Sequence, residues 1–134
     1  MTGEEKNGIN KRSIGSSKEQ LACAYLQRNG VQILEQNFRN RQGEIDLIGR
    51  DGKYLVFFEV KYRRNLQCGG ALAAVDYKKQ RQICKVADYY RCMHGIGDNC
   101  WIRYDVIAIE DEEITWIQNA FEHIYVRERK TYVY

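Results

Sequence analysis

The chain contains 134 residues, carries a formal net charge of +3 and is 44% apolar. This length and composition are typical of one globular domain with its own hydrophobic core. No apolar stretch reaches the roughly 20 residues of a membrane-spanning helix, and the N-terminal segment lacks the apolar centre of a signal peptide. We therefore expect a cytoplasmic protein that does not associate with membranes. Five cysteines without a C-x-x-C pair give little support to a zinc site.

The polar segment 1–13 is expected to be a disordered N-terminal arm, the domain to span residues 14–126, and residues 127–134 to form a charged and aromatic tail. Within the domain, hydrophobic periodicity and turn residues predict two helices, at about 18–28 and 73–92. They also predict four strands, at about 31–37, 44–49, 54–62 and 101–109. Two shorter segments, 114–117 and 121–126, are expected to add an edge strand or a helical turn.

The predicted order is helix, three strands, helix, strand and an edge element. The first three strands can form a meander, and the second helix can serve as a crossover connection. Such a crossover places strand 101–109 parallel to strand 54–62. The sequence therefore predicts an α/β fold of the mixed α+β type, in which helices flank a central mixed sheet.

Two predicted strands carry acidic residues next to long apolar runs. Asp46 lies within Ile-Asp-Leu-Ile at 45–48, and Glu59 follows the run 54–58. A run that is apolar on both faces is typical of a central strand. A charge at the end of such a strand is costly unless it is paired or bound to a metal.

Glu59 and Lys61 are two residues apart and share a strand face, as Glu44 and Asp46 do. If the strands pair through a turn at 50–53, Asp46 and Glu59 converge beside Lys61. Carboxylates next to a lysine on rigid strands suit Mg²⁺ binding and phosphodiester hydrolysis. The alternatives are the solvated face of a hairpin, or a structural ion pair that needs no ligand.

Glu19 is a further acidic candidate, on the first predicted helix. Glu19, Cys23 and Leu26 follow helical spacing, which turns Glu19 towards the buried face. It is therefore either an inward-looking acid or an acid that the helix dipole favours in the first turn.

Basic residues surround the acidic strand segments, whereas acids gather at 110–113. A basic rim around an acidic pocket suits a nucleic acid whose scissile phosphate meets a metal ion. The candidates for contact with the nucleic acid are Arg39, Arg63, Lys78 and Arg81. The alternative is an ordinary set of solvated lysines and arginines.

Together, Glu19, Asp46 and the triplet Glu59-Val60-Lys61 resemble the motif of the PD-(D/E)XK nuclease superfamily, which includes restriction enzymes and archaeal Holliday-junction resolvases. More closely, the chain resembles the YraN-like family of small bacterial proteins. The most specific matching stretches are Gly-Glu-Ile-Asp-Leu-Ile at 43–48 and Phe-Phe-Glu-Val-Lys-Tyr-Arg at 57–63. The position before Asp46 is isoleucine and not proline, a variation that resolvase-like members share.

The resemblance implies a restriction-endonuclease-like core and a role for each matching residue. Asp46 and Glu59 correspond to the metal-binding acids, the Val60 carbonyl is a further ligand, and Glu19 is the helical acid that completes the site. Lys61 corresponds to the lysine that orients or activates the attacking water. The implied cofactor is Mg²⁺ or Mn²⁺. The implied partner is nucleic acid, in particular DNA, with branched DNA as a candidate substrate.

The leading interpretation is a metal-dependent endonuclease, because a degenerate site would be expected to lose at least one of Asp46, Glu59 and Lys61. The second interpretation is a non-catalytic nucleic-acid-binding module with a nuclease-like fold. A third is a structural protein that assembles through surface tyrosines. The sequence does not distinguish DNA from RNA and assigns no role to Glu44 or Asp105. It leaves the oligomeric state open, with a homodimer as one option.

Overall fold

The computed structural model describes residues 11–63 and 75–125. The expected tail at 127–134 and residues 1–10 of the expected arm lie outside these ranges. The described chain contains two helices, α2 (Lys11–Arg28) and α3 (Tyr77–Met93), of which neither has the length and apolar character needed to cross a membrane. Its five strands are β1 (Gln32–Asn40), β2 (Gly43–Asp51), β3 (Tyr54–Arg63), β4 (Trp101–Glu110) and β5 (Glu113–Phe121).

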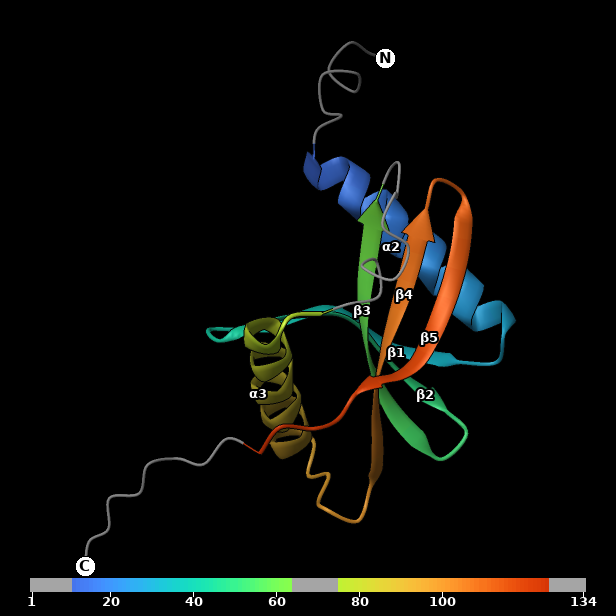
Figure 1. The fold of residues 1–134 in the computed structure, drawn as a ribbon. Coiled ribbons are helices and arrows are strands. Elements are labelled where there is room, and N and C mark those ends of the chain that lie inside the picture. The colour runs from blue at the N-terminus through green and yellow to red at the C-terminus, as the bar shows by residue number, and fades with distance from the viewer. Residues whose placement is uncertain (1–10, 64–74, 126–134) are drawn as a thin grey trace, which may run out of the picture.

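The five strands form one open sheet in the order β1-β2-β3-β4-β5. β1, β2 and β3 pair antiparallel, β3 and β4 run parallel, and β5 returns antiparallel to β4. A parallel pair needs a crossover connection, and α3 lies between β3 and β4 in the chain. The structure thus confirms the predicted mixed α+β fold and the predicted order of elements (Figure 1).

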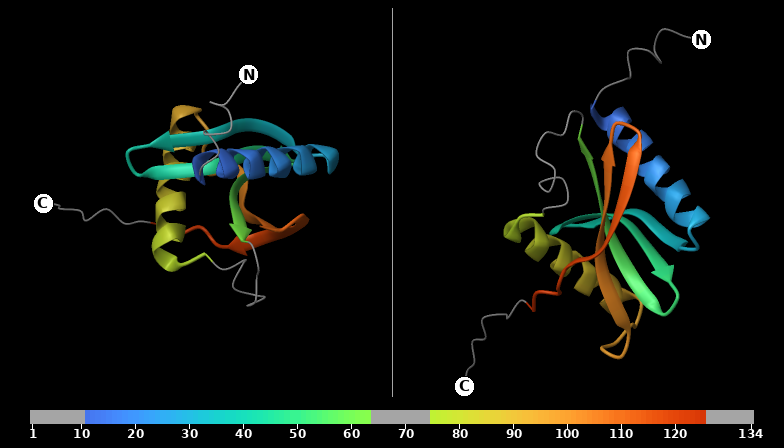
Figure 2. Two further views of the ribbon diagram at one scale, coloured as in Figure 1. Left: turned by 90° about the horizontal axis from the view of Figure 1, so that it is seen from above. Right: turned by 45° about the vertical axis from the view of Figure 1, so that its right-hand side comes forward.

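The two helices cover opposite sides of the sheet and enclose two halves of the hydrophobic core (Figures 1 and 2). On one side, α3 packs against apolar residues that include Ile48 and Phe57. On the other side, α2 packs against residues that include Leu47 and Phe58. Phe57 and Phe58 are each 1% exposed. β3 is therefore buried on both faces, as its continuous apolar run predicts.

The ends of α3 follow from its local sequence. The Asp76 side chain caps the helix by accepting the N–H of Lys79 at 2.8 Å. At the other end, the N–H of His94 donates to the carbonyl of Tyr90, and Gly95 turns the chain away with a φ of 66°. The buried residues between the caps recur at helical spacing, which fixes the face that α3 turns towards the sheet.

Several boundaries differ from the sequence-based expectation. α2 begins at Lys11, whereas the first helix was expected to begin at about residue 18. β5 is one continuous strand from Glu113 to Phe121, whereas two separate segments were expected. Within it, Asn119 has a φ of 55°, and its N–H donates to the buried Asp105 carboxylate at 2.9 Å. This contact with β4 holds the polar stretch in the sheet, and local periodicity does not reveal it.

Candidate metal centre

The candidate site lies where β2 and β3 separate. Their last paired residues are Leu47 and Phe58. One position further, the Asp46 carboxylate replaces a main-chain acceptor, because its Oδ2 atom accepts the N–H of Val60 at 2.8 Å. Continuing the register by one residue places Glu59 across from Asp46. We call this place, defined by Asp46, Glu59 and Val60, the strand fork.

The direction of the Asp46 side chain follows from an irregularity in β1 and β2. Ile45 belongs to the core half under α3, whereas Leu47 belongs to the half under α2. A regular strand would place both on one face, so the alternation breaks at Asp46. Asn37 on β1 lies opposite this break and has a φ of 56°, a conformation that asparagine tolerates better than most residues. Asp46 therefore points towards β3 and not into either core half.

The Asp46 carboxyl group keeps its proton up to a pH well above that at which an aspartate ordinarily ionises. Burial raises the pKa of Asp46 to about 8, and the carboxylates of Glu59, Glu19 and Glu44 add to the effect, while the N–H of Val60 opposes it. Neighbouring negative charges disfavour a further ionised carboxylate. At neutral pH and without a bound cation, the strand fork therefore retains a proton on Asp46.

Glu19 reaches the strand fork from α2. Burial raises the pKa of Glu19 and Glu44 adds to this, whereas side-chain hydrogen bonds with Asp46 and Asn37 and the charge of Arg39 oppose it. Glu19 therefore faces the strand fork.

Glu59 links the strand fork to basic side chains. Its side chain is 16% exposed, and its Oε2 atom lies 3.9 Å from Nζ of Lys79 on α3. Burial raises the pKa of Glu59, while Lys79 and Lys61 lower it. Burial also lowers the pKa of Lys61, and Arg63 acts in the same direction against the attraction of Glu59. The fork thus combines carboxylates with ammonium groups.

The donor set suits a hard divalent cation that keeps part of its water shell. A residue in an extended strand directs its N–H and its carbonyl towards the same neighbour, so the Val60 carbonyl oxygen faces the gap that Asp46 borders. Within residues 11–63 and 75–125, no three His, Cys, Asp or Glu side chains form a group that would hold a metal unaided. Mg²⁺ needs no such cage, because it retains several waters and binds through one or two carboxylates. Asp46 and Glu59 therefore fit Mg²⁺ or Mn²⁺, with Glu19 as a third candidate.

The predicted basic residues lie in different places around the sheet. Arg39 on β1 is exposed and pairs with Glu44 on β2 at 3.5 Å. Arg63 is exposed at the end of β3. Lys78 and Arg81 lie on the exposed side of α3 and line one surface hollow. Neither Arg39 nor Arg63 lines that hollow.

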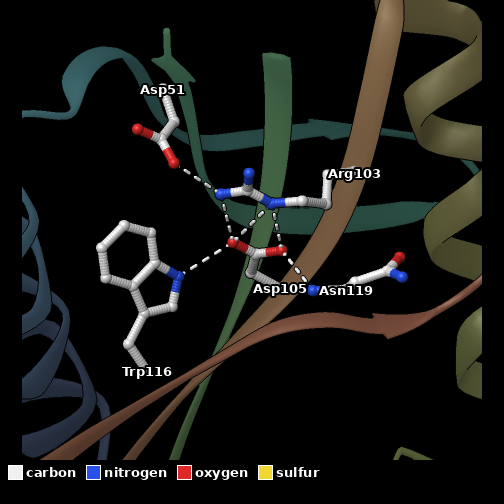
Figure 3. Close-up of polar contacts among 5 residues, drawn as sticks. All are labelled: Asp51, Arg103, Asp105, Trp116 and Asn119. Carbon is white, nitrogen blue, oxygen red and sulfur yellow. Dashed lines mark hydrogen bonds and ion pairs between the residues drawn. The ribbon is translucent and has the colours of Figure 1, made fainter.

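Asp105 has a structural role that the sequence did not assign. It is 1% exposed and accepts hydrogen bonds from Arg103, from the Trp116 indole at 2.8 Å and from the Asn119 N–H at 2.9 Å. Arg103 also donates to Asp51 at 2.7 Å (Figure 3). These contacts tie β4 to β5 and to the end of β2. The sequence does contain a signal for this role, because Arg103 precedes Asp105 by two residues and the two side chains therefore share a strand face.

His123 lies just beyond β5 and makes polar contacts with β4 and α3. Its side chain is 10% exposed, its Nδ1 atom lies 2.7 Å from the Tyr104 hydroxyl, and its Nε2 atom lies 3.4 Å from the Asp88 carboxylate. Burial lowers the pKa of His123, and Asp88 opposes this. The Tyr104 ring stacks on the His123 ring with centroids 5.8 Å apart, and the Tyr125 ring meets it edge-on at 4.7 Å.

The fold and the strand fork together define a class of protein: a mixed α+β domain with clustered carboxylates and lysines where two central strands separate. Residues 18–109 match the family described as Uncharacterised protein family UPF0102. The chain belongs to this family. The matched range includes the whole strand fork and α3.

Similar proteins occur in several organisms. A UPF0102 protein of Legionella pneumophila (strain Corby) is 46% identical over 110 residues, which cover 81% of this chain and 93% of the relative. A UPF0102 protein of Janthinobacterium sp. (strain Marseille) is 44% identical over 112 residues, covering 84% and 89%. One from Lachnoclostridium phytofermentans is 43% identical over 114 residues, covering 85% and 97%. The names of these relatives state the family and no activity.

Proposed function

We propose that the protein is a metal-dependent endonuclease that hydrolyses phosphodiester bonds in nucleic acid, in particular DNA. The observation that supports this proposal is that Asp46 and Glu59 lie across from each other where β2 and β3 separate. Glu19 and Lys61 are near enough to shift the pKa values of these carboxyl groups. This arrangement is the one expected of the PD-(D/E)XK superfamily, in which the chain resembles the YraN-like proteins. Clustered groups with perturbed pKa values are typical of functional sites.

The electrostatics favour a cation site over a purely structural ion pair. A structural ion pair lowers the pKa of its carboxyl group, whereas the pKa of Asp46 is raised to about 8. The positive charges of the lysines near the fork therefore do not neutralise the negative charges of the acidic groups around Asp46. A divalent cation in place of the retained proton would compensate them.

Each residue at the strand fork has a separate proposed role. Asp46 and Glu59 would hold Mg²⁺ or Mn²⁺, with the Val60 carbonyl and Glu19 as further ligands. A bound divalent cation supplies Lewis-acid polarisation of the phosphate and lowers the pKa of water. Lys61 orients the attacking water or offsets the negative charge that develops on the phosphate. Glu59 supports Lys61 in this role, because the two share a strand face and attract each other.

A non-catalytic nucleic-acid-binding module remains the second candidate. The observation that favours it is the hollow between Lys78 and Arg81, which lies on α3 and includes none of the carboxylates of the strand fork. A protein could bind phosphates there without any chemistry at Asp46. A variant without the charge of Asp46 therefore distinguishes the endonuclease from the binding module.

The decisive experiment compares the purified wild type with Asp46→Asn on linear, single-stranded, flapped and four-way DNA in Mg²⁺ and Mn²⁺. Asparagine keeps the shape of the side chain and an oxygen acceptor but removes the anion. We expect the wild type to cleave at least one substrate, and the variant to bind that substrate without cleaving it. Equal cleavage by both proteins would mean that the activity comes from a contaminant. Binding without cleavage by the wild type on every substrate would favour the binding module.

A further inference from the structure

Two adjacent surface hollows lie where the β1–β2 turn meets α3. The first has a volume of about 250 Å³ and is lined by Gln42, Lys78, Arg81, Gln82 and Lys85. The second has a volume of about 520 Å³ and is lined by Asn40, Arg41, Gln42 and Tyr89. Gln42 lines both, so the two hollows are neighbours, and we call them together the turn groove. Figure 1 shows the β1–β2 turn beside α3, where Gly43 lies against Gln82 and Val86.

The first hollow has the character of a phosphate site. Lys78, Arg81 and Lys85 follow one another at i, i+3 and i+7 and therefore lie along one face of α3. No acidic side chain is among the residues that line either hollow. Three cations in a row along a helix attract a polyanion through counterion release, without reading its sequence.

The second hollow adds an aromatic surface to these charges. The Tyr89 side chain is 46% exposed, and its ring lies against Phe38, with ring centroids 6.2 Å apart. One side of the ring is thus supported by the protein while the residue stays open to solvent. Arg41, in the same hollow, supplies a positive charge. Basic grooves with exposed aromatic rings are typical of proteins that bind single strands, because unpaired bases stack on the rings.

The turn groove is built into the fold and is not a product of flexible side chains alone. The Gln42 N–H donates to the Asn40 side-chain oxygen at 2.7 Å, which shapes the turn. The next residue, Gly43, packs so closely on α3 that an added Cβ would lie 3.0 Å from Cγ of Gln82 and 3.5 Å from Val86. Glycine at this position therefore lets the turn close against the helix.

The turn groove is also connected to the strand fork. Gln42 precedes Asp46 by four residues, which corresponds to about 13 Å along β2. At about 3.4 Å per stacked nucleotide, a strand of roughly four nucleotides bridges this distance. On the helix side, Lys79 contacts Glu59 at 3.9 Å, while its neighbour Lys78 lines the groove. The first turn of α3 thus borders both places.

We propose that the turn groove binds an unpaired segment of nucleic acid, with one base stacked on Tyr89 and the adjoining phosphates on Lys78, Arg81 and Lys85. This inference rests on the proposed function, and it specifies the substrate class as nucleic acid with a single-stranded portion. The strand fork then acts on the same strand a few nucleotides away. A purely double-stranded ligand keeps its bases stacked inside the helix and leaves Tyr89 without a partner.

The test measures binding in EDTA, where metal-dependent cleavage cannot occur. The probes are a fluorescein-labelled 20-nucleotide single strand of DNA and the same sequence as a duplex, titrated at several salt concentrations. The variants are Tyr89→Leu, Tyr89→Phe and the double variant Arg81→Gln with Lys85→Gln. Trp101→Leu is the matched control, because Trp101 is also an exposed aromatic beside a cation, Lys53, at the start of β4. Thermal melting of each variant confirms that it is folded.

We expect the wild type to bind the single strand more tightly than the duplex. Tyr89→Leu should weaken single-strand binding about tenfold and leave the salt dependence and duplex binding unchanged, while Tyr89→Phe and Trp101→Leu bind like the wild type. The double variant should reduce the slope of log K against log salt by about 0.7 for each phosphate that it no longer neutralises.

Preference for the duplex, equal weakening of both ligands by Tyr89→Leu, or no binding by the wild type would overturn the inference. These outcomes are distinct from failure of the proposed function. A protein that binds the single strand through Tyr89 but cleaves no substrate in Mg²⁺ or Mn²⁺ would retain the turn groove and lose the endonuclease assignment.

Discussion

Replacing Asp46 by asparagine should stabilise the protein at alkaline pH when no metal is present. The pKa of Asp46 is raised from its ordinary value of 3.8 to about 8 in the folded protein. Between these two values, the unfolded chain releases the proton while the folded chain retains it. The stability that the protonated group contributes is therefore complete below pH 4 and is lost as the pH rises towards 8. Asparagine does not titrate, so the variant escapes this loss.

The size of the effect follows from the width of that pH window. Each pH unit inside it costs about 1.4 kcal/mol, so the step from pH 5 to pH 8 costs the wild type at most about 4 kcal/mol relative to Asp46→Asn. For a domain of this size, about 4 °C of melting temperature corresponds to 1 kcal/mol. The difference in melting temperature between variant and wild type should therefore grow by an amount on the order of 15 °C.

The assay is thermal melting of both proteins in EDTA from pH 5 to pH 8.5, followed by a titration of Mg²⁺ at pH 8. Metal at a hundred times its dissociation constant should stabilise the wild type by about 2.7 kcal/mol and leave Asp46→Asn nearly unchanged. Asp111→Asn is the control, because Asp111 is an exposed turn residue with a φ of 56° that asparagine adopts readily. A melting difference that stays constant across the pH range would refute the electrostatic description of the strand fork.

Three further predictions concern the rest of the molecule. Asp105→Asn should destabilise the protein by about 3 kcal/mol in urea unfolding, because it leaves the buried Arg103 charge without its main partner. A loss of stability below about 1 kcal/mol would show that Asp51 alone is sufficient to pair with the Arg103 charge. Gly49→Ala should cost about 2 kcal/mol, since the new Cβ would lie 2.8 Å from Val31 Cγ1 and 2.9 Å from the Gln32 carbonyl oxygen, whereas Gly97→Ala, with open space around it, should be nearly neutral. Finally, a thiol reagent should label the exposed Cys92 quickly but Cys84 only as the protein unfolds, because burial raises the pKa of the Cys84 thiol and excludes the reagent; peptide mass spectrometry that finds both modified at one rate would contradict this.

The parts of the fold that depend on local pattern could be predicted from the sequence. The apolar run at 54–58 marked a central strand, and the helix after it implied a crossover and hence a parallel neighbour. The same strand rules placed Glu59 beside Lys61 and brought Asp46 towards Glu59. These features depend on residue spacing within single elements and on one tight turn, which a sequence displays directly.

The remaining features depend on contacts between distant segments. The break in strand alternation at Asp46 requires Asn37 on the neighbouring strand, and no pattern within β2 shows it. The ion pair between Glu59 and Lys79 depends on where α3 crosses the sheet. The continuity of β5 depends on the bond from Asn119 to Asp105. In each case the partner lies nine or more residues away along the chain, and its position is set by the packing of the whole sheet.

The irregular edge strands bear on how copies of this protein could associate. The edge strands of the sheet are β1 and β5, and each contains an irregularity in its pairing with the inner neighbour. In β1 the register shifts between Ile33 and Glu35. In β5 it shifts at the stretch that pairs with residues Tyr104 to Val106 of β4. Such bulges twist an edge and interrupt the row of unpaired main-chain groups that another strand would need. Both open sides of the sheet are thereby protected against strand addition and the aggregation that follows from it. Extension of the sheet along the full length of either edge would require straightening a bulge, so we expect any homodimer of this protein to form through its side-chain surfaces.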